Sequence, residues 1–104
     1  MAFTDKAEFQ IPRHIVQKGG VNVEQISAHR TLTYSDSQYQ RLDAQSGSLN
    51  VILPAYKDGA MFVINAQGYS ITVKDNDGAT TIKALSVGEG GMFCSDGSSW
   101  KQFI

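Results

Sequence analysis

The chain has 104 residues, with nine Lys and Arg against ten Asp and Glu, and a net charge of −1. This length predicts one domain, and the near-neutral charge argues against a nucleic-acid-binding protein, which needs a basic patch. The single cysteine, Cys94, excludes an internal disulfide. No apolar run is long enough to span a membrane, and residues 1–10 lack the regions of a signal peptide. We therefore expect a soluble protein made in a cytoplasm.

Residues 1–29 are expected to form an extended N-terminal arm. Their apolar side chains fit neither a helical nor a strand period, and Pro12 and Gly19-Gly20 interrupt any regular element. A short strand at Phe9–Ile11 or at Val21–Gln25 fits the pattern, as does a first hairpin of the main domain. Apolar anchors in so polar a stretch favour packing on a partner over a solvated tail. The anchors are Phe3, Phe9, Ile11, Ile15 and Val16.

Residues 30–104 are expected to form a β-domain. Short β-prone runs begin about every ten residues and are separated by turn residues, the pattern of an all-β sandwich or barrel. Asp-Gly and Asn-Asp-Gly turns favour hairpins, so we expect about eight short antiparallel strands. These are Thr31–Tyr34, Tyr39–Asp43, Leu49–Leu53, Met61–Ile64, Tyr69–Lys74, Thr80–Leu85, Gly91–Ser95 and Ser99–Ile104.

Large apolar side chains of the later strands are expected in the core or in a subunit interface. Phe93 and Trp100 flank the Asp96-Gly97 turn, where side chains of paired strands meet. The predicted set is Phe62, Ile64, Phe93, Trp100 and Phe103.

The sequence offers few groups that could converge in an enzyme site. Neither His14 nor His29 has another metal ligand at a suitable spacing. Cys94 is expected to pack as a small hydrophobic side chain, because the neighbouring Asp96 would not lower the pKa of its thiol. We therefore predict no catalytic residue, no metal site and no cofactor.

Three other patterns favour structural explanations. Asp75 and Asp77 match the start of a calcium loop, but Gly78 comes too early and no acid follows at position twelve, so a hairpin turn explains the motif. Residues 88–91 lack the spacing of a dinucleotide-binding loop. Aromatic side chains could form a carbohydrate platform, although packing between strands is their commoner use. They are Tyr34, Tyr39, Tyr56, Tyr69 and Trp100.

An ordered series of short motifs covers about 70% of the chain. The series runs Arg30-Thr31-Leu32-Thr33-Tyr34-Ser35-Asp36-Ser37-Gln38-Tyr39-Gln40, Leu53-Pro54, Gly59-Ala60-Met61-Phe62-Val63-Ile64-Asn65 with Gly68, Ile71-Thr72-Val73, Gly78, Gly88, and Asp96-Gly97-Ser98-Ser99-Trp100. In this order the motifs resemble a small β-domain of tailed-bacteriophage virion proteins. Domains of this kind occur in capsid decoration (cement) proteins and in head or tail fibre modules.

The resemblance implies a non-enzymatic structural protein of the virion, commonly a homotrimer. We expect a decoration protein on the capsid surface, because the sequence has no heptads or collagen-like repeats for a shaft. Its partners would be the major capsid protein and two further copies of itself, with no nucleic acid and no membrane. The arm would contact the capsid or a neighbouring protomer. The alternative is a tail, baseplate or fibre-tip component that contacts a receptor or a glycan.

Overall fold

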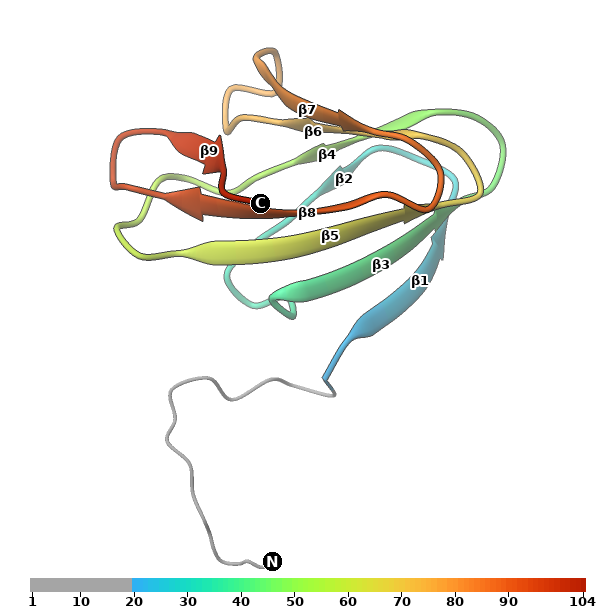
Figure 1. Ribbon diagram of the computed structural model, residues 1–104, viewed down its shortest axis with the longest axis horizontal. Helices are drawn as coiled ribbons and strands as arrows, with labels where there is room; N and C mark the ends of the chain where they lie inside the picture. Colours follow the sequence, from blue (N-terminus) through green and yellow to red (C-terminus); the bar gives the residue numbers. More distant parts are fainter. Residues whose placement is uncertain (1–19) are drawn as a thin grey trace, which may run out of the picture.

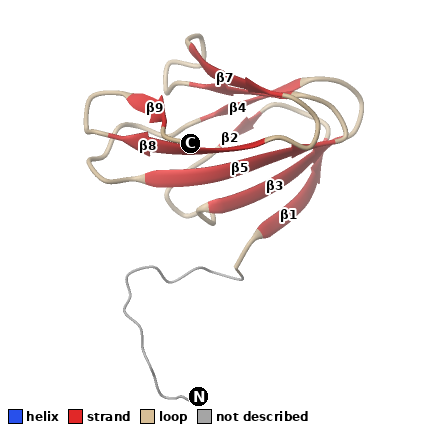
Figure 2. Ribbon diagram, viewed as in Figure 1, coloured by secondary structure: helices blue, strands red, loops and turns tan. Residues whose placement is uncertain are grey.

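The computed structural model describes residues 20–104, and this part of the chain is all-β, with nine strands and no helix. Two sheets face each other (Figures 1 and 2). One sheet has five strands in the order β1-β3-β5-β8-β9, and the other has four in the order β2-β4-β6-β7, so the structure is not a closed barrel. The strands are β1 (Asn22–Ile26), β2 (Arg30–Thr31), β3 (Tyr39–Ala44), β4 (Leu49–Ile52), β5 (Met61–Gln67), β6 (Ile71–Lys74), β7 (Thr81–Leu85), β8 (Gly90–Ser95) and β9 (Trp100–Gln102).

The first six strands form a flattened coil. The chain passes from one sheet to the other after each strand, so β1, β3 and β5 are parallel neighbours in one sheet, and β2, β4 and β6 are parallel neighbours in the other. The last three strands are antiparallel: β7 pairs with β6, β8 with β5, and β9 with β8.

The expectation of antiparallel strands is therefore wrong for the first six. Turn residues show where the chain reverses, but they do not show whether the next strand joins the same sheet or the opposite one. Here each connection from β1 to β6 leads into the opposite sheet. Neighbours within the four-stranded sheet are consequently far apart in sequence: Arg30 pairs with Val51, 21 positions later, and Val51 pairs with Val73, 22 positions later.

The region of regular strands begins earlier than residue 30. Residues 22–26, within the predicted arm, form β1, which pairs with β3 from Asn22↔Gln40 to Ile26↔Ala44. This is close to the strand expected at Val21–Gln25. Residues 1–19, which make up most of the predicted arm, lie outside the described residues.

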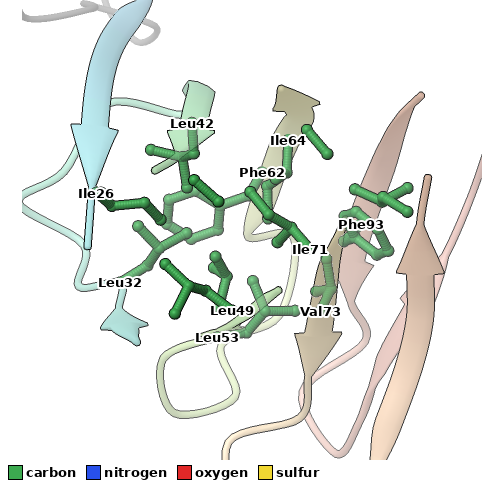
Figure 3. Close-up of a cluster of buried hydrophobic side chains, with 14 of the residues drawn as sticks. Ile26, Leu32, Leu42, Leu49, Leu53, Phe62, Ile64, Ile71, Val73 and Phe93 are labelled. Carbon is green, nitrogen blue, oxygen red and sulfur yellow. The ribbon is translucent and has the colours of Figure 1, made fainter. Parts of the chain in front are cut away.

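Alternate side chains of both sheets fill one apolar core (Figure 3). In β5, every second residue is buried, as in a strand with one face inward. The largest side chains meet where Trp100, the first residue of β9, contacts Phe62 and the loop after β4. The Phe62 and Trp100 rings lie 6.0 Å apart, and the Trp100 indole Nε1 donates a 2.8 Å hydrogen bond to the Pro54 carbonyl. The indole is 2% exposed, so its polar N–H has the partner that burial requires.

Candidate functional site

We call the edge formed by β1, β2 and residues 33–38 the open end. At the opposite side of the coil, β8 covers the edge of β5 and β7 covers the edge of β6. Among the described residues, no strand covers β1 or β2 in this way. Unpaired strand edges are the parts of a sheet that most readily accept another strand, so the open end is the first candidate for binding.

An ion-pair network joins the two sheets at the open end. Arg30 on β2 contacts Glu24 on β1 through Nη1 and Oε1 at 2.5 Å, and contacts Asp36 through Nη2 and Oδ1 at 2.9 Å. The Arg30 side chain is only 25% exposed. Its guanidinium therefore holds β1, β2 and the loop that follows β2 in one arrangement.

Amide side chains extend this network into the sheet. Asn22 Nδ2 donates to Glu24 Oε1 at 3.0 Å and to Gln40 Oε1 at 2.7 Å. Gln40 is buried, and its Nε2 donates to the Ser37 carbonyl at 2.7 Å. The polar groups on this wall thus have defined partners, which gives the wall a fixed shape.

A hollow of about 280 Å³ lies against this wall. It is lined by Val21, Asn22, Arg30, Ser35, Asp36, Ser37 and Gln40. The lining offers hydroxyl, amide, guanidinium and carboxylate groups next to one aliphatic side chain. Such a surface suits a peptide segment, which presents both backbone polar groups and apolar side chains.

The electrostatics of the network keep its charges fixed at neutral pH. Hydrogen bonds from Asn22 and then from Arg30 lower the pKa of Glu24 below its ordinary value. Burial disfavours the charged Arg30, but the bond to Glu24 and the neighbouring Asp36 charge outweigh it and raise the Arg30 pKa. Glu24 and Arg30 therefore remain ionised near neutrality and act as a structural pair rather than as proton donor and acceptor.

Four of the five predicted core or interface residues lie inside the protein. Ile64 and Phe93 are fully buried, and Phe62 and Trp100 are 2% exposed. Phe103 differs, because its side chain is 69% exposed at the end of the sheet. The predicted arm residues lie outside the described part of the chain, so their role stays a prediction; they are Phe3, Phe9, Ile11, Ile15 and Val16.

Other residues considered for chemistry have structural partners. His29 Nδ1 accepts a 2.9 Å hydrogen bond from the Asn50 backbone N–H. Asp77 Oδ1 accepts bonds from the backbone N–H groups of Ala79 and Thr80 at 2.8 and 2.9 Å, which explains the aspartate in this turn. Cys94 is a half-buried free cysteine. Within residues 20–104, no group of three or more His, Cys, Asp and Glu side chains could hold a metal ion.

The aromatic side chains do not share one exposed face. Trp100 is in the core, whereas Tyr34 and Tyr56 are 45% and 40% exposed near the turn that follows β4. The Tyr34 hydroxyl donates to the Ala55 carbonyl, and the Lys57 ammonium lies 5.4 Å from the centre of the Tyr34 ring. Tyr69 is exposed in the turn between β5 and β6, at the other end of the strands (Figure 1).

Analysis of the sequence missed the Arg30 network. Glu24, Arg30 and Asp36 are each six positions apart, a spacing that matches no helix or hairpin contact. One signal was present: Asn22, Glu24 and Ile26 alternate with Val23 and Gln25, which places Glu24 on the inner face if the segment is a strand. A carboxylate on an inner face requires a cation opposite it.

Comparison with known protein families, characterised proteins and solved structures gives no significant match to this chain. In the described part of the chain, no helix has the length and apolar character needed to cross a membrane.

Proposed function

We propose that this protein is a structural component of a bacteriophage virion, namely a capsid decoration protein that binds the assembled shell as a homotrimer. The proposal starts from the resemblance of the motifs in residues 30–104. It is supported by one structural observation, which is a pair of large apolar side chains that are exposed just after β9.

The exposed pair is Phe103 and Ile104, which are 69% and 72% exposed. Their backbone continues the pairing of β9 with β8: Phe103 N–H donates to the Met92 carbonyl at 2.6 Å, and Met92 N–H donates to the Ile104 carbonyl at 2.9 Å. Both side chains are thus held in water by a hydrogen-bonded backbone. Burying them against another subunit would gain about 1.5–3 kcal/mol for each side chain.

The functional consequence is linkage between binding and assembly. A trimer that binds the assembled shell, but not loose capsid subunits, shifts the equilibrium toward the shell. This role requires a stable scaffold with contact surfaces and needs no catalytic group. The all-β core and the two edges of the five-stranded sheet fit that requirement.

The subunit contact is tested by light scattering coupled to size exclusion. We expect the full chain to have three times its monomer mass of 11.3 kDa, and the double variant Phe103→Ser, Ile104→Ser to be a monomer. Val87→Ser is the matched control, because Val87 is 57% exposed but lies in the turn between β7 and β8. A wild-type monomer at tens of micromolar, or a trimer unchanged by the double substitution, would contradict the proposed contact.

The location on the shell is tested by cryo-electron microscopy of virions assembled with and without the protein. We expect trimeric density on the outer capsid surface that disappears when the protein is omitted. Density at the tail or baseplate instead would overturn the decoration role.

A specific observation favours a second candidate, a fibre-tip or baseplate component that binds a glycan. Tyr34 and Tyr56 are exposed at the same end of the strands, and aromatic faces commonly pack on sugar rings. A glycan array probed with the wild type and with Tyr56→Ala would detect this function. Tyr69→Ala is the control, since Tyr69 is equally exposed at the opposite end.

A further inference from the structure

We propose that the trimer closes head to tail: Phe103 and Ile104 of one protomer pack on the β1 edge of the next protomer, against its Val21 and Val23. The inference rests on the proposed homotrimer and names the second surface of its subunit contact. Both surfaces belong to the five-stranded sheet, in which β1 and β9 are the two edge strands.

The first argument is symmetry. In a ring of three subunits, each protomer contacts one neighbour on either side, and the two contacts use different surfaces of the protomer. Unless the apolar pair after β9 lies on the three-fold axis itself, it therefore meets a different surface of the neighbouring protomer. That surface must be apolar as well, because it has to remove Phe103 and Ile104 from water.

The second argument is the choice of apolar surface on the described residues. Val23 is 69% exposed on β1, and Val21 is 53% exposed just before this strand. The other candidates are single side chains: Val87 lies alone in a turn, and the exposed tyrosines carry polar hydroxyls. Besides Phe103 and Ile104, the exposed large apolar residues within 20–104 are Val21, Val23, Tyr34, Tyr56, Tyr69 and Val87.

The third argument is an apolar row that joins the two edges across the outer face of the sheet. Tyr39 on β3 pairs with Val63 on β5, and Val63 pairs with Met92 on β8. Met92 in turn forms backbone hydrogen bonds with Phe103 and Ile104. The three middle side chains alternate with buried neighbours, so they face away from the core, and they are half-buried. A solvated sheet face usually carries polar side chains, so an apolar row on this face favours a covered surface.

The size of a stable contact requires this row. A stable interface buries about 800 Å² from each partner, whereas one aromatic side chain supplies about 150–250 Å² when it is buried. The row also fits a three-fold axis. Five strands about 4.8 Å apart span about 24 Å, and the centre of a triangle with sides of this length lies about 7 Å from each side. Packed sheets about 10 Å apart fill about 5 Å above each sheet, so long side chains such as Tyr39 and Met92 would fill the space at the axis.

The β1 edge also offers a hollow to the incoming segment. The hollow of about 280 Å³ at the open end has Val21 in its lining, together with hydroxyl and amide groups. An apolar side chain of the neighbouring protomer that enters it would contact Val21. The polar groups around it would bond to the backbone of the same segment, as in other sites that bind an extended peptide.

Disulfide trapping tests the head-to-tail contact. In a Cys94→Ser background, Val23→Cys and Phe103→Cys lie on opposite edges of one sheet, separated by four strand spacings or about 19 Å, which excludes an internal disulfide. We expect mild oxidation to link neighbouring protomers into a covalent ring of three chains. This linking should be at least tenfold faster than in the control pair, Val87→Cys with Phe103→Cys, and the single variant Phe103→Cys should stay unlinked.

Light scattering of the unoxidised protein separates this inference from the proposed homotrimer. A wild-type monomer would overturn both. A wild-type trimer in which Phe103→Cys alone forms linked dimers would show that the pair meets its own copies at the axis, and would overturn only the head-to-tail contact. A trimer in which the test pair links no faster than the control pair would do the same.

A second variant guards against a defect caused by the cysteines. The double variant Val21→Ser, Val23→Ser should be a monomer at a concentration where the wild type is a trimer. Its far-ultraviolet circular dichroism spectrum should be unchanged, because both side chains are exposed in the protomer. Val87→Ser is the matched control and should remain a trimer. A trimeric Val21→Ser, Val23→Ser variant would overturn the head-to-tail contact.

Discussion

The first six strands and the last three differ in how they pair with their neighbours and in which sheet edges they cover. In the coil of β1 to β6, neighbouring strands of a sheet are parallel and come from successive windings of the coil. Each winding therefore depends on the next one for its hydrogen bonds between strands. The last three strands are antiparallel and cover one side of the coil. They also bring Phe93 and Trp100 into the core. The coil alone would leave two uncovered sides, and within residues 20–104 the antiparallel strands close one of them.

The two regions also use different forces. Near β9, the contact of Trp100 with Phe62 is apolar and almost fully removed from water. At the open end, Arg30, Glu24 and Asp36 join the sheets through partly exposed charges. Partly exposed ion pairs contribute little free energy compared with a buried aromatic ring. We therefore expect the side closed by β9 to dominate stability and the open end to be more sensitive to pH.

The largest expected effect comes from the closing strands. Trp100→Ala removes a buried ring and leaves the Pro54 carbonyl without its donor, so it should lower the free energy of unfolding by about 3–5 kcal/mol. Urea unfolding followed by circular dichroism measures this loss. Tyr69→Ala, at an exposed ring, is the control and should cost far less. Similar losses of unfolding free energy in the two variants would contradict the expectation that the side closed by β9 contributes most of the stability.

The second prediction compares the loss of stability at two glycines. One lies in the connection from β5 to β6, which joins the two sheets, and the other lies in the turn before β8. Gly68, between β5 and β6, has a φ of +77°, and a Cβ there would collide with the Ala44 carbonyl and the Asp43 carboxylate. Gly88, before β8, has a φ of +86° but open space around it. Gly88→Ala should cost about 1–2 kcal/mol from backbone strain alone. Gly68→Ala should lower the free energy of unfolding clearly more than Gly88→Ala, which a comparison of their urea midpoints measures. Equal losses would mean that the end of β3 shifts easily to make room for the added Cβ.

The smallest effect is the pH dependence of the open end. Hydrogen bonds from Asn22 and Arg30 lower the pKa of Glu24 in the folded protein. The stabilisation from ionised Glu24 is therefore complete above the unfolded pKa of about 4.3, and is lost as the pH falls through the lower folded pKa. Urea midpoints measured from pH 6 to pH 3 should fall less steeply for Glu24→Gln than for the wild type. Asp77→Asn is the comparison variant outside the network, because Asp77 also has a lowered pKa in the folded protein. There the cause is hydrogen bonds from the backbone N–H groups of Thr80 and Ala79 in a turn. If the urea midpoint of Glu24→Gln falls with pH as steeply as that of the wild type, the network does not contribute to the pH dependence of stability.

The sequence by itself determined the all-β class, the positions of most turns, and the burial of Phe62, Ile64, Phe93 and Trp100. These features depend on local chemistry: turn residues reverse the chain, and large apolar side chains on β-prone runs leave water. Only the tertiary structure decided which sheet each strand joins. That choice made six strands parallel and brought Glu24 and Asp36 to the same guanidinium. The physical reason is that a turn fixes the direction of the next strand over a few residues, whereas partners 21 positions apart are selected by packing across the whole core.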